Sequence, residues 1–535
     1  MFRSMACPLQ CTMPYFQHAS FSHCQHHLSM TDSFKLVFTV ALKQEIPLEW
    51  LQQQIPVCSV AAAQSGFLKS LPPTQQQGVL VLITGVGKEK SLQAAEWIAS
   101  QLKPMFVVNI GSAGAVDNHH LHHWVAAKHV SSEEALQKNL ELSALPFYPE
   151  FTVHQQGILR STHDPYTNAD QEKPEYYDFV DMEAYAQAEV FHANNITFSS
   201  VKYITDLCSK SSLENYQQAL EGMRESSKKL LSFINKKAPM SVSVVIPVHN
   251  RPDWIVDTIR SVIAQSYAVM EIIVVDDGSD IPLVSSIEEF ADTITLLRLP
   301  ENTGVSAARN AGAALAKGEW LAFLDSDDHW ASKKLAKQIE YLQQQPYLNA
   351  LQCEEIWIRN GVRVNAHKHH QKKEGWIWQH CLQRCLITPS AILLKKSVYD
   401  ELNGFDEAML ACEDYDLWLR LSRRFPVGLN LYQGVIKHGG HDDQLSQRHS
   451  AMDRFRVYAL IKALRNEQEQ TYQQALLDTL REKITILILG ARKRSLEKEV
   501  QAYEALLNHI KAFYNRADHT ELSLENIQWL LASSV

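Results

Sequence analysis

Two aspartates that follow an apolar run have the residue type and spacing of metal ligands. Asp325 and Asp327 come directly after residues 320–324, which are apolar enough to form a buried strand. Residues two apart in an extended segment lie on the same side, so both carboxylates face one point. Carboxylate oxygens are hard ligands that suit Mg²⁺ or Mn²⁺. We therefore predict that Asp325 and Asp327 hold one of these ions, whose charge would stabilise a departing diphosphate.

Other residues with useful chemistry follow neighbouring apolar runs in the same order along the chain. Asp277 comes shortly after the run 271–275, and its carboxylate suits hydrogen bonds to a nucleoside base or ribose. Residues 302–310 are typical of a helix start, where free backbone N–H groups and the guanidinium of Arg309 can bind a diphosphate. An isolated Asp-x-Asp pair is better explained by a solvated turn, so the prediction depends on this series.

Together with residues 245–251, these segments resemble the large family of inverting glycosyltransferases with a GT-A fold. The resemblance implies a Rossmann-like half that binds a UDP-, GDP- or dTDP-sugar, with Mn²⁺ or Mg²⁺ as cofactor and a glycan or lipid-linked acceptor. It also implies Asp277 near the base and Asp327 as the principal metal ligand. A scaffold that binds sugar nucleotides without turnover is the alternative. The residues expected to bind the nucleotide sugar are Pro247, Asp277, Arg309, Asp325, His438 and His441.

An acidic pair further along is typical of that family's acceptor half. Glu413 and Asp414 open a predicted helix, and an inverting transfer needs a base that removes the proton of the acceptor hydroxyl. We predict Asp414 as this base, with Glu413 as the second choice. The alternative is that acids in a first helical turn only stabilise the helix dipole, by under about 1 kcal/mol at a surface. Residues 437–446 resemble a loop that closes over donor phosphates, where His438 and His441 are equal candidates against a purely structural glycine turn.

The first half of the chain carries a fainter resemblance to the nucleoside phosphorylase and nucleosidase family. That family's pattern implies that Asp206 protonates a leaving purine, Glu183 holds ribose hydroxyls and Glu45 activates water. Lys202 stands where the family often has arginine, and the segment 117–179 is short and polar. Two interpretations therefore stay open: an active nucleosidase, or a degenerate module that binds a purine nucleoside or a partner without cleavage. The matching segments are residues 41–46, 84–88, 109–114, 180–184 and 202–206.

Alternating strands and helices must position these residues in both halves. Apolar runs and helical segments alternate from residue 34 to 234 and again from 242 to 324, which predicts two open α/β sheets. We predict the fold class α/β, with a nucleoside phosphorylase-like domain, a GT-A Rossmann-like domain and a helical C-terminal tail. The basic, proline-ended stretch 236–239 is the best boundary between the domains. The expected parts are 1–33 as a disordered extension, 34–236, 241–450 and 451–535.

Composition limits what the whole chain can be. Its 535 residues exceed one ordinary core, and 45% hydrophobic and 21% charged residues are typical of a globular protein. No apolar run approaches the length needed to cross a membrane. A net charge of −9 disfavours a nucleic-acid-binding protein. Scattered cysteines suit a reducing compartment, so we expect a cytoplasmic protein, with peripheral contact to the inner face of a membrane and homo-oligomerisation both open.

Overall fold

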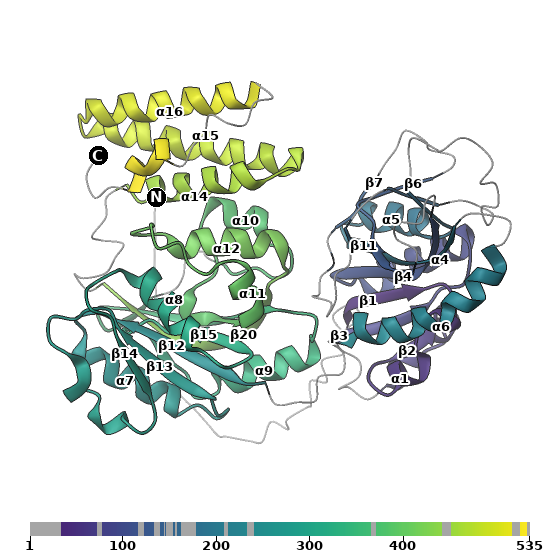
Figure 1. Ribbon diagram of the computed structural model, residues 1–535, viewed down its shortest axis with the longest axis horizontal. Coiled ribbons are helices and arrows are strands. Elements are labelled where there is room, and N and C mark those ends of the chain that lie inside the picture. Colours follow the sequence, from purple (N-terminus) through teal and green to yellow (C-terminus); the bar gives the residue numbers. More distant parts are fainter. Residues whose placement is uncertain are drawn as a thin grey trace, which may run out of the picture.

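The computed structural model describes residues 34–71, 78–115, 122–132, 140–143, 145, 154–155, 158–161, 178–207, 212–232, 240–364, 371–440, 451–515 and 525–531. Figure 1 shows two sheet-containing domains, with a stack of C-terminal helices over the second. This arrangement confirms the predicted fold class, which is α/β with two α/β domains and a helical C-terminal region. The predicted extension 1–33 lies outside the described residues.

The first sheet is built on parallel strands that are rich in Val, Leu and Ile. The order is β2-β3-β1-β4, and β11 pairs in parallel with β4. Their burial is nearly continuous, as expected for a parallel sheet covered on both faces. The carboxyl ends of β1, β4 and β11 therefore meet at one edge. The elements are β1 (Phe34–Val40), β2 (Val57–Ser59), β3 (Gly78–Ile83), β4 (Phe106–Ala115), β11 (Thr197–Leu207), α4 (Lys88–Trp97), α5 (Ala184–Ala193) and α6 (Ser212–Leu230).

The segment 117–179 adds more structure to this sheet than its polar sequence indicates. Short strands extend the sheet beyond β4 and β11. Strands of two to four residues show too little alternation of polar and apolar residues for a sequence pattern to predict them. They are β5 (Trp124–Ala126), β6 (His129–Ser132), β7 (Leu140–Glu141), β8 (His154–Gln155), β9 (Ile158–Ser161) and β10 (Phe179–Asp181).

The second sheet combines a parallel half with a mixed half. Its order is β14-β13-β12-β15-β19-β17-β20-β16, with β14 to β15 parallel and β19 antiparallel to β15. Every residue of β12 is buried, which fits a central parallel strand. The strands are β12 (Val242–Val248), β13 (Glu271–Asp276), β14 (Thr295–Arg298), β15 (Trp320–Phe323), β16 (His329–Trp330), β17 (Ala350–Arg359), β19 (Ile392–Lys395) and β20 (Gly428–Gly439). The helices of this domain include α7 (Pro252–Ile263), α8 (Val305–Leu315), α9 (Lys334–Gln344), α11 (Lys396–Glu401) and α12 (Glu413–Arg424).

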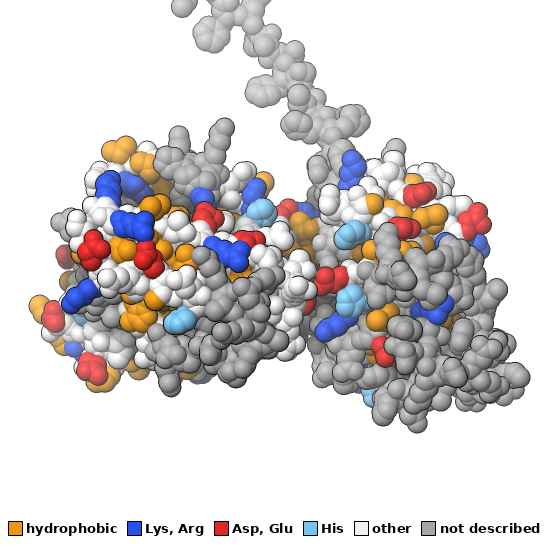
Figure 2. Space-filling view, turned by 90° about the horizontal axis from the view of Figure 1, so that it is seen from above, with side chains coloured by type: hydrophobic (Ala, Val, Ile, Leu, Met, Phe, Trp, Pro, Cys, Tyr) orange, Lys and Arg blue, Asp and Glu red, His pale blue; other side chains and the backbone are white. Residues whose placement is uncertain are grey.

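The C-terminal helices share a hydrophobic core with the second sheet. One cluster of buried side chains contains Phe323 of the sheet together with Phe455 and Leu480 of the helices. Seen from above in Figure 2, cationic, anionic and hydrophobic side chains are interspersed over this region. Within the described ranges, no helix combines the length and hydropathy needed to cross a membrane. The helices are α14 (Asp453–Asn466), α15 (Gln470–Lys493) and α16 (Glu497–Asn515), followed by the short helix Glu525–Leu531.

Candidate functional site

The parallel strands of the second sheet end at a cavity of about 310 Å³. Because β12 lies between β13 and β15, the loops after all three strands converge at one edge, where ligands of open α/β sheets bind. Asp277 does not line the cavity, and His441 lies outside the described residues. The cavity does bring together these residues singled out in the sequence: Pro247, Arg309, Asp325, Asp327, Glu413, Asp414 and His438.

Arg309 of α8 is a buried bridge between two of the acids. Its Nη2 donates to Oδ1 of Asp325 at 2.6 Å, and its Nη1 donates to Oε1 of Glu413 at 2.8 Å. Burial raises the pKa of Asp325, but the nearby charges, Arg309 foremost, outweigh burial and lower it overall. Burial, together with the neighbouring charge of Asp414, raises the pKa of Glu413 overall, although Arg309 lowers it. Glu413 is thus committed to holding Arg309.

Asp327 pairs with an arginine that the sequence pattern contains but does not single out. Nη1 of Arg251 lies 2.8 Å from Oδ2 of Asp327, and both side chains are mostly buried. Nδ1 of His438 lies 3.0 Å from the carbonyl oxygen of Asp327 and 3.2 Å from Nδ1 of His329. Because a carbonyl only accepts, Nδ1 of His438 carries a proton in that contact, which leaves its Nε2 for a ligand.

Two further charged residues of the cavity, Asp328 and Lys437, are ones that sequence reasoning missed. Oδ2 of Asp328 accepts from the hydroxyl of Ser390 at 2.7 Å, and its Oδ1 accepts from the backbone N–H of His438 at 3.1 Å. Burial raises the pKa of Asp328 well above its ordinary value. Burial lowers the pKa of Lys437, yet the surrounding carboxylates, Asp328 first, raise it overall. Their positions beside Asp327 and His438 were the only signal in the sequence.

Asp414 differs from its neighbour Glu413 in what it contacts. Its Oδ1 accepts from the backbone N–H of Tyr415 at 2.7 Å, and its Oδ2 accepts from the thiol of Cys385 at 3.3 Å. A thiol is a weak donor, and no arginine or lysine is hydrogen-bonded to this carboxylate in the described part of the chain. The carboxylate lines the cavity and is therefore placed to accept a proton there.

Asp277 positions the start of α8. Its Oδ1 accepts from the backbone N–H and the hydroxyl of Thr303 at 2.8 and 2.9 Å, and its Oδ2 accepts from the N–H of Gly304 at 2.9 Å. The carboxylate thereby fixes the turn from which Arg309 is presented. Contact of Asp277 with a nucleoside base stays a prediction.

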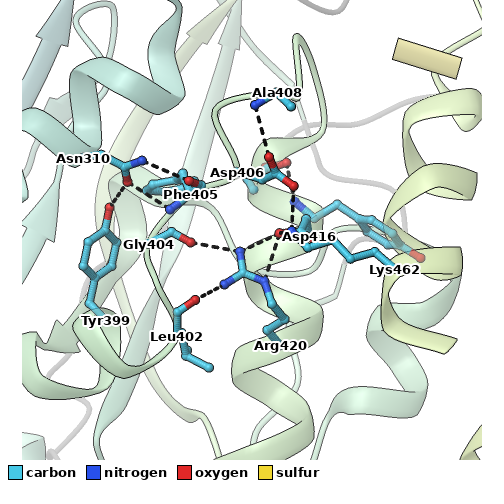
Figure 3. A network of polar contacts seen from close by, with 12 residues as sticks. Asn310, Tyr399, Leu402, Gly404, Phe405, Asp406, Ala408, Asp416, Arg420 and Lys462 are labelled. Carbon is cyan, nitrogen blue, oxygen red and sulfur yellow. Dashed lines mark hydrogen bonds and ion pairs between the residues drawn. The ribbon is translucent and has the colours of Figure 1, made fainter. Parts of the chain in front are cut away.

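A polar network beside the cavity ties several elements together (Figure 3). Asn310 of α8 donates to the carbonyl of Phe405 at 2.9 Å and accepts from the hydroxyl of Tyr399 at 2.5 Å. The ring of Phe405 in turn lies under the guanidinium of Arg309, 5.0 Å from its centre. On the other side of the network, Lys462 of α14 lies 3.2 Å from Asp416. The network therefore links α8 to the C-terminal helices.

A divalent cation fits the residues at this site. Among the described residues there is no ready-made group of three or more His, Cys, Asp or Glu side chains that could hold a metal. However, Asp325 and Asp327 line the same cavity, and Arg309 engages only one oxygen of Asp325. A cation bound with a nucleotide takes one or two protein carboxylates and draws its other ligands from phosphate and water. Two carboxylates are therefore a sufficient donor set.

The first sheet also gathers acids at its carboxyl edge. Glu45, just after β1, is buried, and its Oε1 accepts from the backbone N–H and the hydroxyl of Ser112 at 3.1 and 2.8 Å. Its Oε2 accepts from the N–H of Leu42 at 3.0 Å. One set of contacts comes from β4 and the other from the turn just after β1, so Glu45 is fixed at the edge where both strands end.

Lys202 forms the cationic centre of this second cluster. Its Nζ lies 2.8 Å from Oδ2 of Asp181, and both side chains are buried. Burial lowers the pKa of Lys202, but Asp181, Glu183 and Glu45 outweigh burial and raise it. Burial also raises the pKa of Glu183 to about 7, although Lys202 opposes the shift. Glu45 and Glu183 thus both lie close to Lys202, whereas the side chain of Asp206 lies outside the described part.

Comparison with known proteins identifies relatives of the second half. The family model described as glycosyl transferase family 2 matches residues 243–400. The putative teichuronic acid biosynthesis glycosyltransferase TuaG of Bacillus subtilis is 40% identical over 186 residues, which cover 34% of this chain and 72% of TuaG. The first curated relatives, uncharacterized glycosyltransferases of Rickettsia species, are matched over only 31% to 33% of their length.

Solved structures resemble parts of the chain at low sequence identity. TarS residues 1–349 of S. aureus, solved with UDP, is 15% identical with a TM-score of 0.40, covering 54% of this chain and 90% of that one. A 5′-methylthioadenosine/S-adenosylhomocysteine nucleosidase from S. pneumoniae is 16% identical with a TM-score of 0.30, covering 37% of this chain and 98% of the nucleosidase.

Proposed function

The chain belongs to glycosyl transferase family 2, and from this premise we propose that its second half transfers a sugar, with inversion, from a nucleotide diphosphate to a hydroxyl of a glycan or lipid-linked acceptor. One observation carries the proposal. A single cavity contains the metal-ligand pair Asp325 and Asp327, the cation Arg309 and the base candidate Asp414. Donor, cation and base would therefore meet at one point.

The charges around the cavity suit a sugar nucleotide. Arg251, Arg309 and Lys437 line it, and cationic side chains of this kind bind diphosphate oxygens. Asp325 and Asp327 would hold Mn²⁺ or Mg²⁺, which supplies positive charge for the departing diphosphate. His438 can donate or accept at the same wall through Nε2.

Asp414 would act as the general base. The acceptor hydroxyl oxygen forms a bond to the anomeric carbon from the face opposite the diphosphate, while the bond from that carbon to the diphosphate oxygen breaks. The hydroxyl proton passes to Asp414, and the bonding electron pair leaves with the diphosphate. Attack from the opposite face inverts the anomeric centre, and a positioned base of this kind contributes about 10²–10⁴-fold.

A donor panel tests the proposal. UDP-, GDP- and dTDP-sugars are incubated with the full chain and Mn²⁺, and release of nucleoside diphosphate is measured. We expect one donor class to be consumed and the Asp327→Asn variant to lose about 10²-fold or more of that release. Asp292→Asn, an exposed aspartate away from the cavity, is the matched control and should match wild type.

The alternative, a scaffold that binds sugar nucleotides without turnover, predicts a different outcome. Such a protein would bind one nucleoside diphosphate by calorimetry yet release none from its sugar donor. Metal-independent binding with no release from any donor, in wild type and both variants, would rule out the transferase.

For the first half we propose a purine nucleoside site at Glu45, Glu183 and Lys202. The buried convergence of these side chains at the carboxyl edge of the first sheet supports it. Glu183, with a pKa of about 7, can exchange hydrogen bonds with ribose hydroxyls in either protonation state. Glu45 would activate the attacking water, with Asp206 protonating the base.

Adenine release separates catalysis from binding in this half. The full chain is incubated with methylthioadenosine and with adenosylhomocysteine, and free adenine is measured. If the wild-type chain releases adenine and the Glu45→Gln variant does not, the first half is a nucleosidase. Binding of methylthioadenosine without release of adenine indicates the degenerate module. If the chain neither binds methylthioadenosine nor releases adenine, the nucleoside site is refuted.

A further inference from the structure

The C-terminal helices contribute side chains to the cavity of the second half. Met452 and Arg456, at the start of α14, lie on its wall. Neither belongs to the part of the chain that matches the family model, which ends at residue 400. Arg456 is thus a further cation of the cavity, in addition to the three proposed to bind the donor diphosphate.

The position of α14 is fixed by several contacts with the sheet domain. Lys462 lies 2.6 Å from Asp406 and 3.2 Å from Asp416 (Figure 3). Phe455, next to Arg456, is fully buried in the core shared with the second sheet. A helix held by a buried ring on one side and ion pairs on another presents Arg456 to the cavity as a built feature.

The guanidinium of Arg456 has donors to spare. Its Nη1 lies 2.8 Å from Oδ1 of Asp453, and its Nε is buried without a hydrogen-bond partner among the described residues. The same Asp453 oxygen also lies 3.4 Å from Nζ of Lys483, so one carboxylate serves two cations. By contrast, both Nη atoms of Arg309 are engaged by carboxylates. Arg456 therefore shares its carboxylate partner with a second cation.

Arg456 lies on the acceptor side of the candidate base. The groups that act on it electrostatically are Asp453 and the thiols of Cys412 and Cys385. Cys385 is also the thiol that donates to Asp414. None of these groups comes from the strand ends that carry the proposed metal ligands, so Arg456 lies nearer to Asp414, where the proposed function puts the acceptor hydroxyl, than to those strand ends.

We propose that Arg456 binds a phosphate group of the acceptor. An arginine binds phosphate oxygens through its N–H donors, and Nη2 of Arg456, which no carboxylate engages among the described residues, is the atom that would do so. The inference rests on the proposed transferase function and names the acceptor's chemistry. Either a lipid-linked phosphate or a free phosphorylated glycan supplies that group.

Phosphate binding in the presence of bound nucleotide tests this assignment. The full chain is saturated with UDP, or with whichever nucleoside diphosphate binds, and Mg²⁺, so that the donor phosphate site is filled. Inorganic phosphate is then titrated by calorimetry. We expect Arg456→Gln to weaken phosphate binding about 10-fold or more, Arg456→Lys to weaken it less, and Arg465→Gln, an exposed arginine of the same helix, to match wild type.

Two acceptor arms distinguish the sources of the phosphate. One arm uses phosphatidylcholine vesicles with and without polyprenyl phosphate, and the other uses glucose 6-phosphate against glucose. Transfer to only one of the two phosphorylated acceptors identifies the source of the phosphate. The KM for that acceptor should rise in Arg456→Gln.

Contrary outcomes are also distinct. Unchanged phosphate affinity in a folded Arg456→Gln variant, or a wild type that binds nucleotide but no phosphate, overturns the inference alone. A variant that loses UDP affinity as much as phosphate affinity would place Arg456 at the donor and overturns it too. A wild type that binds no nucleoside diphosphate contradicts the transferase itself.

Discussion

Adjacent carboxylates on α12 have different surroundings, and these separate their roles. Glu413 is held by Arg309, whereas Asp414 accepts only from a backbone N–H and a thiol. We expect Asp414→Asn to lose about 10²–10⁴-fold of transfer because the base is gone, with UDP affinity and melting temperature near wild type.

We expect Glu413→Gln to lower both melting temperature and UDP affinity because Arg309 loses a buried partner. Donor turnover, calorimetry and thermal melts measure these effects. An active Asp414→Asn beside an inactive, normally folded Glu413→Gln would make Glu413 the base instead.

Lys334 is a buried cation with an energetic penalty. Its Nζ has no hydrogen-bond partner among the described residues and lies 3.8 Å from the centre of the Trp330 ring. Burial lowers its pKa from 10.5 to about 8. Because the folded pKa is below the unfolded one, the penalty is complete below pH 8 and disappears as pH rises towards 10.5.

Lys334→Met should therefore stabilise the protein. The lowered pKa of Lys334 corresponds to a gain in the free energy of unfolding on the order of 3 kcal/mol at pH 7, and this gain falls to none above pH 10.5. Urea unfolding at pH 7 and pH 10 measures it. Lys337→Met, on the exposed face of the same helix, is the control and should change stability by less than about 0.5 kcal/mol. A gain in Lys334→Met that is equal at both pH values would mean packing, and not charge, is responsible.

At the scale of elements, the network around Asp416 joins α12 to α14. Its buried carboxylate accepts from Arg420 at 2.9 Å and lies 3.2 Å from Lys462. We expect Asp416→Asn to destabilise the protein by about 2 kcal/mol, since two partly buried cations lose their shared anion. Urea unfolding gives the free energy, and hydrogen exchange should increase in α14. The surface pair of Asp400 with Lys396 is the matched control, and Asp400→Asn should change stability by under about 1 kcal/mol. Equal losses in the two variants would contradict a structural role for the network.

The elements that a sequence predicts well are those whose own pattern is long enough. β12 and β15 were predictable because parallel central strands read as continuous apolar runs, and α8 because a glycine turn precedes it. The short strands β7 and β8 were not, because two residues carry no periodicity. Residues that line the cavity close to a strand end, such as Asp327, were predictable in the same way. Arg456 was not, because only tertiary packing of α14 brings it to the cavity.

At the scale of the whole molecule, the two sheet domains pack through the amino ends of the first sheet. Phe106, the first residue of β4, contacts Tyr347 and Trp376 edge to face at 5.6 and 6.3 Å between ring centres. Lys35 of β1 pairs with Glu374 at 2.5 Å. Glu45 lies at the opposite, carboxyl end of β1. The candidate nucleoside site therefore lies at the edge of its sheet away from the second domain, which separates it from the cavity of that domain.

Gly78 is the position at which this packing can be tested most sharply. It has a φ of +93°, and a Cβ there would lie 2.1 Å from the carbonyl oxygen of Gln344 in α9. Gly66 has a similar φ of +102° with nothing within 4 Å of an added Cβ. Both substitutions to alanine strain the backbone, but only Gly78→Ala drives a methyl group into the backbone of the other domain.

We expect Gly78→Ala to separate the two domains while each stays folded. Its radius of gyration by small-angle X-ray scattering should increase, residues 344–348 should exchange hydrogen faster, and thermal unfolding should split into two transitions. Gly66→Ala should keep the wild-type scattering and lose only about 1 kcal/mol of stability, because strain within one domain does not reach the contact. Sugar-donor turnover should survive in Gly78→Ala, since the cavity lies wholly within the second half. Wild-type scattering from a folded Gly78→Ala variant would mean that the close approach of β3 to α9 does not hold the domains together.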